Sequence, residues 1–327
     1  MPTTALRQIQ RPLVVASGRA HPELAQDVAK ELGVDLLPVS AYDFANTETY
    51  VRFSESIRGA DIFLLQSHTA PINQWIMEHL LMVDAAKRAS AHTITAVAPF
   101  LGYARQDKKG RGREPISARL MTDLLATAGA DRLMSVDLHT AQIQGFFDGP
   151  VDHLWALPIL VDYVRTRVDV DNVTVVSPDA GRIRVAEIWA SKLGGGPLAF
   201  VHKTRDVTRP NQAVANRVVG DVEGKDCVLV DDLIDTGGTI AEAVKVIMAA
   251  GARSVTVAAT HGVLSGPAPQ RLADCGATEV VVTDTLPIEA SKRFDSLTVL
   301  SIAPLIATAI KEVFTDGSVT SLFDGNA

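Results

Sequence analysis

The chain has 327 residues, of which 47% are hydrophobic, so two domains with sizeable buried cores are expected. Its formal net charge of -7 argues against a dedicated nucleic-acid binder, because such proteins usually carry a basic balance. No apolar run approaches the length of a membrane span, and the two cysteines lack metal or CxxC spacing, so we expect a cytoplasmic protein without membrane contact.

Strand-like runs alternate with helical patterns along the first half of the chain. Continuous apolar runs predict buried strands at 12–18, 61–67, 93–101 and 132–139. Apolar residues at helical spacing predict helices at 21–33, 72–89 and 116–130. Buried strands that alternate with helices are typical of parallel sheets covered on both faces, so we expect an α/β fold.

A basic segment, RQDKKGRGREPISAR, follows the strand predicted at 93–101. Most charge runs are solvated surface loops, and that interpretation stays open here. Arg105 and Gln106 lie directly past the strand, where open parallel sheets bind their ligands, and this placement suits a triphosphate. Because the chain has no GxxxxGK[ST] loop, side chains and metal would have to bind such a triphosphate.

The same alternation restarts after about residue 150, which suggests an internal duplication. Gly149, Pro150 and Pro158 punctuate the boundary, so we predict domains at 1–150 and 151–327. In the second domain, strands are predicted at 172–179, 198–204, 226–232 and 254–262. Helices are predicted there at 181–194 and 238–251.

The stretch VLVDDLIDTGGTI ends a buried strand in carboxylates and then turns on two glycines. Gly237 and Gly238 allow a sharp turn, and a helix from about Thr239 would present free N–H groups to a phosphate. Asp231 and Asp232 would repel phosphate but accept hydrogen bonds from ribose hydroxyls. A phosphate beside a diol describes ribose 5-phosphate; the alternative is an ordinary strand–turn–helix with solvated acids.

VLVDDLIDTGGT closely resembles the phosphoribosyl-binding motif of phosphoribosyltransferases and of ribose-phosphate pyrophosphokinases (PRPP synthetases). Further stretches resemble the pyrophosphokinases, namely PFLGYARQDKKGRGREPISARL, SVDLHTAQIQGFF, VVSPDAG and SVTSLF. The likeness covers nearly the whole chain. It implies two tandem phosphoribosyltransferase-like domains, each a mostly parallel sheet flanked by helices, with ATP on the N-terminal side and ribose 5-phosphate in the C-terminal domain.

The resemblance also implies a reaction, that of a ribose-phosphate diphosphokinase (EC 2.7.6.1). Such an enzyme transfers the pyrophosphoryl group of ATP to the C1 hydroxyl of ribose 5-phosphate, giving AMP and 5-phosphoribosyl 1-diphosphate for nucleotide biosynthesis. The implied cofactor is Mg²⁺. Likeness to the phosphate-dependent class I type further implies a homo-hexamer that phosphate activates and ADP inhibits.

Substrate-binding roles follow from the resemblance, residue by residue. ATP would be bound by Phe44, Asn46, Thr47, Glu48, Arg105 and Gln106. Ribose 5-phosphate would be bound by Arg205, Asp231, Asp232, Asp235, Thr236, Gly237, Gly238 and Thr239. Asn46 and Thr47 depart from the family pattern, which has Asp and Gly at these two positions of a Phe-x-Asp-Gly-Glu loop.

The remaining roles concern the reacting phosphates. Lys203 and Arg205 match the outer cations of the family's Lys-Arg-Arg and are the expected catalytic residues. His139 and Asp179 match positions linked to the metal. Because Mg²⁺ prefers oxygen ligands, we expect His139 to act through water or on a phosphate oxygen.

Two other functions stay open at this point. A nucleobase phosphoribosyltransferase would share the sugar site, but it would leave Arg105, Gln106 and His139 without a purpose. A non-catalytic, regulatory relative would bind partners, although the chain has Lys203, Arg205 and both ligand motifs.

Overall fold

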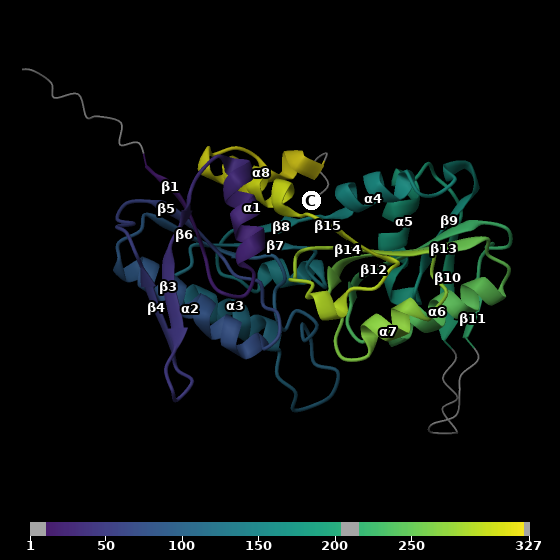
Figure 1. Cartoon of the computed structure of the whole chain (residues 1–327), viewed down its shortest axis with the longest axis horizontal. Helices are drawn as coiled ribbons and strands as arrows, with labels where there is room; N and C mark the ends of the chain where they lie inside the picture. The colour runs from purple at the N-terminus through teal and green to yellow at the C-terminus, as the bar shows by residue number, and fades with distance from the viewer. Residues whose placement is uncertain (1–10, 204–215, 324–327) are drawn as a thin grey trace, which may run out of the picture. The chain divides into compact units, whose positions relative to one another are not determined.

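The chain forms two compact units. The computed structural model describes residues 11–203 and 216–323 (Figure 1). The first unit comprises Met1–Leu154 together with Ala303–Ala327, and the second comprises Trp155–Ile302.

The first unit is built on a parallel sheet. In spatial order its strands are β2 (Leu36–Leu37), β1 (Leu13–Ser17), β5 (Asp61–Leu65), β6 (Thr93–Ala98), β7 (Arg132–Val136) and β8 (Val151–Leu154). Each neighbouring pair in this order runs parallel. A separate antiparallel hairpin consists of β3 (Val39–Asp43) and β4 (Thr49–Phe53).

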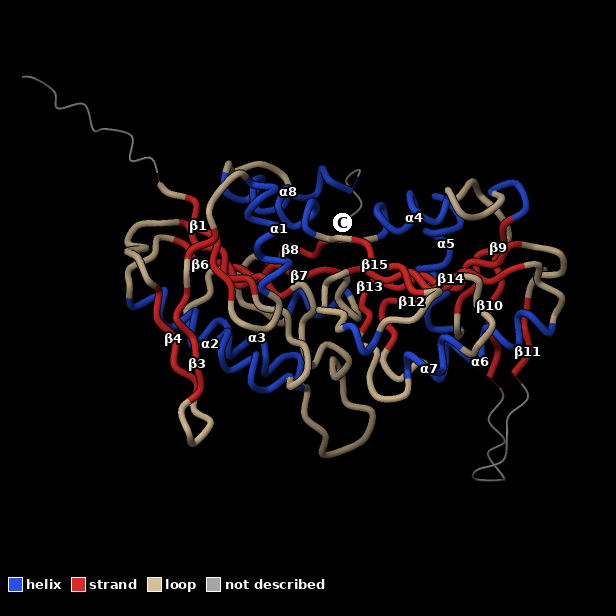
Figure 2. Tube along the Cα trace, in the orientation of Figure 1, coloured by secondary structure: helices blue, strands red, loops and turns tan. Residues whose placement is uncertain are grey.

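Helices cover both faces of this sheet, so its strands are buried. Figure 2 shows α1 (Pro22–Leu32) and α8 (Ala303–Phe314) on one face and α2 (Ile72–Arg88) and α3 (Ser117–Ala128) on the other. Short 3-10 turns lie at Ala141–Gly145 and Val319–Phe323. Burial on both faces explains why these strands are continuous apolar runs rather than alternating ones.

Local signals decide where α1 begins and ends. Pro22 occupies the first turn, where its missing N–H costs nothing, and the side chain of His21 accepts a hydrogen bond from the N–H of Leu24. Gly33 ends the helix in the left-handed conformation at φ 69, which glycine adopts without steric cost.

The second unit has a mixed sheet with one antiparallel edge. In spatial order its strands are β11 (Asn216–Val219), β10 (Leu198–Lys203), β9 (Val173–Ser177), β12 (Asp226–Ile234), β13 (Ser254–Gly262), β14 (Glu279–Thr283) and β15 (Leu297–Leu300). The pair β10 and β11 is antiparallel, whereas the other neighbouring pairs are parallel. Three short 3-10 turns lie at Val170–Asn172, Ala180–Arg182 and Ala290–Lys292.

Helices again lie on both faces of the sheet. In Figure 2, α4 (Leu157–Arg165) and α5 (Ile183–Lys192) cover one face, and α6 (Gly238–Ala249) and α7 (Ala268–Ala273) cover the other. The predicted α/β class, with a mostly parallel sheet and flanking helices in each half, is therefore confirmed. No helix within the described ranges is long and apolar enough to cross a membrane.

The C-terminal segment differs from the domain prediction. We expected residues 151–327 to form the second domain, but the structure groups Ala303–Ala327 with the first unit. The reason is the apolar face of α8, where Ile306, Ala307 and Ile310 are buried, and α8 packs against α1. The spacing of apolar residues indicates that one face of such a helix must be buried, but it does not identify the unit against which the face packs.

We therefore predict that Ile310→Ala destabilises the first unit. Ile310 is fully buried, so the loss should be about 2–5 kcal/mol, as for other large-to-small core changes. Amide hydrogen exchange in the variant should accelerate in α1, and α6 of the second unit should keep its protection. Lys311→Ala, at an exposed neighbour on the same helix, is the matched control. Faster exchange in α6 with α1 unchanged would assign α8 to the second unit instead.

Candidate active site

In the first unit, the predicted polar residues lie in the loops that follow two neighbouring strands. Arg105 and Gln106 follow β6, and His139 follows β7. These strands pair in parallel, so their carboxyl ends lie at the same edge of the sheet. Arg105 is exposed and His139 is half-buried. The amide oxygen of Gln106 accepts a hydrogen bond from Ser117 Oγ at 2.6 Å, so the first turn of α3 fixes this side chain.

Asp107 ties the two loops together. Its buried carboxylate accepts hydrogen bonds from Thr140 Oγ1 at 2.8 Å and from Gln142 Nε2 at 2.6 Å. The loop of Arg105 is thereby attached to the loop of His139. The sequence analysis missed Asp107, although it directly follows Gln106, because its partners are more than thirty residues away.

The loop Phe44–Glu48 closes the β3–β4 hairpin. Phe44 N–H donates to the carbonyl of Glu48 at 2.8 Å, and the Asn46 side-chain oxygen accepts from Glu48 N–H at 3.2 Å. Thr47 lies in the left-handed region at φ 70, the conformation that a glycine adopts most easily. Asn46 and Thr47 thus shape the loop, and Phe44 is 47% exposed.

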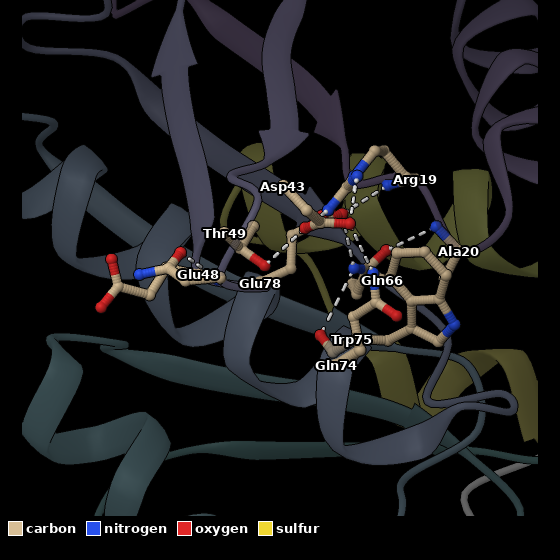
Figure 3. A network of polar contacts seen from close by, with 10 residues as sticks. Arg19, Ala20, Asp43, Glu48, Thr49, Gln66, Gln74, Trp75 and Glu78 are labelled. Atoms are coloured by element: carbon tan, nitrogen blue, oxygen red, sulfur yellow. Dashed lines mark hydrogen bonds and ion pairs between the residues drawn. The ribbon is translucent and has the colours of Figure 1, made fainter.

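A network of charged residues holds this hairpin to the rest of the first unit (Figure 3). The Arg19 guanidinium donates to both oxygens of Asp43, at 3.1 and 2.7 Å, and Thr49 Oγ1 donates to the same carboxylate at 2.9 Å. Arg19 also donates through Nε and its backbone N–H to Glu78, each at 2.6 Å. Glu78 is fully buried on α2, so Arg19 connects a buried carboxylate to the base of the hairpin.

In the second unit, the acidic pair lies inside a strand rather than just beyond it. We predicted a strand at 226–232, but β12 extends to Ile234. Asp232 N–H donates to Asp231 Oδ1 at 2.9 Å. Arg182 contacts both acids: its Nη2 lies 2.8 Å from Asp232 Oδ1, and its Nε lies 3.7 Å from Asp231 Oδ1.

The electrostatic setting of the pair is unusual for two adjacent acids. Burial, together with the neighbouring Asp232, raises the pKa of Asp231, and Arg182 opposes part of that rise. The sequence analysis missed Arg182. Its position three residues after Asp179 could have marked it as a candidate site residue. Nothing in the local sequence, however, indicates that its guanidinium reaches β12.

The glycine turn has the geometry of an anion cradle. Gly237 lies in the left-handed region at φ 71 and caps α6, which begins at Gly238, as the helix predicted at 238–251 does. A Cβ built on Gly238 would have a single neighbour within 4 Å, Arg271 Nη1 at 3.7 Å. The N-terminal N–H groups of this 12-residue helix therefore border open space.

Neighbouring loops support the cradle. Arg271 Nη1, from α7, donates to the carbonyl of Thr236 at 3.1 Å. The N–H of Leu264 donates to the carbonyl of Ile234, and the N–H of Ser265 donates to that of Asp235. Thr236 and Thr239 are exposed and Asp235 is half-buried, so the structure brings these residues together around the turn.

The predicted metal and catalytic residues lie in different surroundings. Asp179 follows β9, next to β12, and its carboxylate accepts a hydrogen bond from Gly181 N–H at 2.8 Å. Within the described ranges, no group of three or more His, Cys, Asp and Glu side chains could hold a metal ion. Lys203 is the last residue of β10, and Arg205 lies outside the described residues.

Two family models match the chain. The N-terminal domain of ribose phosphate pyrophosphokinase matches residues 13–129. The phosphoribosyl synthetase-associated domain matches residues 200–324.

Similar proteins match over nearly the full length. A ribose-phosphate pyrophosphokinase of Bifidobacterium longum is 73% identical over 314 residues, which cover 95% of this chain and 92% of that protein. One of Corynebacterium glutamicum is 64% identical over 325 residues, covering 99% of this chain and 100% of that protein. The crystal structure of phosphoribosylpyrophosphate synthetase from Mycobacterium smegmatis has a TM-score of 0.89 and 63% identity, covering 94% of this chain and 100% of that one.

The Arg19 network generates a prediction about stability. Arg19→Ala leaves the fully buried Glu78 without its cation, so the free energy of unfolding should fall by about 3 kcal/mol, the lower end for a broken buried pair. Denaturant unfolding measures this loss. The double variant Arg19→Ala with Glu78→Gln should recover part of it, because no buried charge remains.

Arg88→Ala is the control, because Arg88 pairs with Asp84 on the exposed surface of the same helix that carries Glu78. This variant should unfold like the unmodified protein. A loss as large as that of Arg19→Ala, or no recovery in the double variant, would mean that the buried charge of Glu78 is not the cause.

Proposed function

The chain belongs to the ribose-phosphate pyrophosphokinase family, and from that premise we propose that it transfers the pyrophosphoryl group of ATP to the C1 hydroxyl of ribose 5-phosphate. The products are AMP and 5-phosphoribosyl 1-diphosphate. The observation that carries the proposal is the end of β12, where paired carboxylates precede a glycine turn and an open helix N-terminus. A diol and a phosphate on one small molecule match these two features.

The ribose 5-phosphate site is proposed in the second unit. The N–H groups at Gly237, Gly238 and Thr239 bind the 5-phosphate at the positive end of the α6 dipole. Asp231 and Asp232 accept hydrogen bonds from the ribose hydroxyls. Their position in β12 holds the carboxylates on a rigid strand, which limits the entropy lost on binding.

Further residues of the turn complete this site. Thr236 and Thr239 contribute hydroxyl donors to the phosphate. Asp235 accepts a backbone hydrogen bond through its carbonyl from Ser265, which anchors the turn. Arg205 is assigned to the same substrate.

ATP is assigned to the first unit. Phe44 supplies an exposed ring that can stack on the base, and Glu48 supplies a carboxylate for its amino group. Asn46 and Thr47 shape the loop that carries both. Arg105 and Gln106, in the loop after β6, are assigned to the nucleotide, and Asp107 holds that loop.

The cofactor is proposed to be Mg²⁺, with Asp179 and His139 as the residues linked to it. A carboxylate oxygen is the ligand type that Mg²⁺ prefers, and the metal commonly takes its other ligands from phosphates and water. When bound, it neutralises phosphate charge. His139, an unfavourable direct ligand for Mg²⁺, acts through water or on a phosphate oxygen.

The reaction is a displacement at phosphorus. The C1 oxygen forms a bond to the β-phosphorus as the bond from that phosphorus to the bridging oxygen of AMP breaks, and AMP leaves with that oxygen. Lys203 and Arg205 stabilise the charge that develops on the phosphates. Catalysis of this kind depends mainly on positioning and on charge stabilisation.

Assembly and regulation are also proposed from the family likeness. We expect a homo-hexamer that phosphate activates and ADP inhibits, working in the cytoplasm. The 73% identity to a ribose-phosphate pyrophosphokinase weighs against the nucleobase phosphoribosyltransferase and against the non-catalytic relative.

The proposed reaction predicts its own stoichiometry. Incubation of the protein with ATP, Mg²⁺ and ribose 5-phosphate should yield AMP and 5-phosphoribosyl 1-diphosphate in equal amounts. Chromatography with phosphorus NMR measures both products, and omission of ribose 5-phosphate is the control. Accumulation of ADP in place of AMP would indicate transfer of a single phosphoryl group and would refute the proposal.

The two halves of the β12 site predict two separable defects. Asp231→Ala should raise the KM for ribose 5-phosphate ten- to hundredfold, because a lost hydrogen bond to a charged group costs roughly 1.5–3 kcal/mol. Gly238→Val should be worse, since a β-branched side chain would occupy the space of the phosphate. Affinity for ATP, measured by calorimetry, should change little in both variants.

Asp295→Ala is the matched control, because Asp295 is an exposed acid of the same unit. It should leave both substrate affinities unchanged. If Asp231→Ala and Gly238→Val instead lose ATP binding and keep ribose 5-phosphate binding, the assignment of the two substrates is inverted.

A further inference from the structure

We propose that Arg182 is a positioning residue for ribose 5-phosphate: its guanidinium holds the Asp231–Asp232 pair in the orientation that accepts the sugar hydroxyls. The inference deepens the proposed function and rests on its assignment of these two acids to the ribose.

Topology brings Arg182 to the acids. It is the last residue of the turn Ala180–Arg182 after β9, and β9 pairs in parallel with β12. The loops that follow the two strands therefore share one edge of the sheet. The turn is itself fixed, because Asp179 caps it through Gly181 N–H and the Ser177 hydroxyl donates to the carbonyl of Asp179 at 2.6 Å.

The contacts of the guanidinium are unequal. Its Nη2 forms a close ion pair with Asp232 at 2.8 Å, whereas Nε is 3.7 Å from Asp231 and leaves that carboxylate more available. All three side chains are largely withdrawn from solvent, with exposures of 20%, 17% and 11% for Arg182, Asp231 and Asp232. Asp232 is thus anchored, and Asp231 is held through its bond from Asp232 N–H at 2.9 Å.

Charge explains why a cation is needed there. Two adjacent carboxyl groups that are largely withdrawn from solvent repel each other when both are ionised, so one of them tends to keep its proton. A protonated carboxyl donates a hydrogen bond, and a ribose hydroxyl needs an acceptor for its own proton. Arg182 neutralises one charge of the pair and thereby opposes this protonation: burial and Asp232 raise the pKa of Asp231 to about 8, and Arg182 keeps it from rising further.

Shape explains why the cation is an arginine. The guanidinium is planar and presents several donors in fixed directions, so one side chain can address two carboxylates at once. A lysine ammonium is a single compact charge and could replace only the contact to Asp232. The arrangement therefore predicts a graded response to substitution at position 182 rather than an all-or-none response.

Two other roles for Arg182 make different predictions. A purely structural residue, one that only fixes the start of α5, would affect unfolding and leave substrate affinities alone. A residue that binds the phosphate chain of the nucleotide would affect ATP and leave ribose 5-phosphate alone. Binding of each substrate, measured separately, distinguishes these cases from positioning of the sugar acids.

The experiment compares Arg182→Ala and Arg182→Lys with Arg184→Ala. Arg184 is exposed on α5, two residues along, and carries the same charge, so its variant should behave as the unmodified protein. Calorimetry with ribose 5-phosphate alone should give a dissociation constant raised at least tenfold for Arg182→Ala and less for Arg182→Lys. The KM for ATP should stay within about twofold, because the acids are not assigned to the nucleotide.

A double-mutant cycle adds a readout that general loss of structure would not give. Asp232→Asn removes the charge that Arg182 pairs with, so the two changes should be strongly non-additive: Arg182→Ala in that background should weaken ribose 5-phosphate binding much less than it does alone. If Arg182→Ala unfolds, Arg182→Lys carries the comparison in both backgrounds.

Equal ribose 5-phosphate affinity in Arg182→Ala and Arg184→Ala, or additive effects in the cycle, would overturn the inference. A defect confined to ATP would overturn it in favour of a phosphate-binding role. The proposed function has a separate test: it would be refuted if the unmodified protein formed no AMP. The binding comparison at position 182 uses calorimetry and does not depend on turnover.

Discussion

Parallel strand pairing is the constraint on which both candidate sites depend. Because parallel strands end at one edge of a sheet, the pairing of β6 with β7 brings the loops of Arg105 and His139 together. The pairing of β9 with β12 does the same for Asp179 and the acids of the second unit. Residues far apart in the sequence thus become neighbours without any local signal, and burial of both sheet faces by helices keeps those edges rigid.

In each unit, acids that are withdrawn from solvent pair with an arginine from another element. Glu78 on α2 meets Arg19 from the loop after β1, and Asp231 and Asp232 meet Arg182 from the loop after β9. An unpaired buried charge costs several kcal/mol, so each of these pairs constrains where its loop can lie. The pairs contribute little net stability compared with an apolar core, but they fix the loops that are assigned to substrates. Stability and site geometry are therefore coupled through the same side chains.

The sequence predicts elements and motifs better than it predicts partners. Apolar runs located β1, β5, β6, β7, β9, β10, β12 and β13, and helical spacing located α1, α2, α3, α5 and α6, because both signals are local. Neither the β3–β4 hairpin, whose strands are short and partly polar, nor α8 was foreseen, and the structure groups α8 with the first unit although 151–327 was predicted as one domain. Arg19, Asp107 and Arg182 were missed for the same physical reason: each acts through a contact distant in sequence.

The hairpin loop departs from the family motif at two positions, and its own hydrogen bonds hold it together. The family pattern has Asp-Gly where this chain has Asn46-Thr47, and a threonine in the left-handed region costs roughly 1–2 kcal/mol more than a glycine. That strain is offset by local bonds, because Asn46 accepts from Glu48 N–H and the strand pair Asp43–Thr49 closes the loop. Arg19 then holds Asp43 from outside the hairpin. The backbone bond from Phe44 N–H to the carbonyl of Glu48 fixes where these two side chains leave the loop. Asn46 and Thr47 therefore help to hold the loop that carries Phe44 and Glu48, the pair proposed to bind the nucleotide.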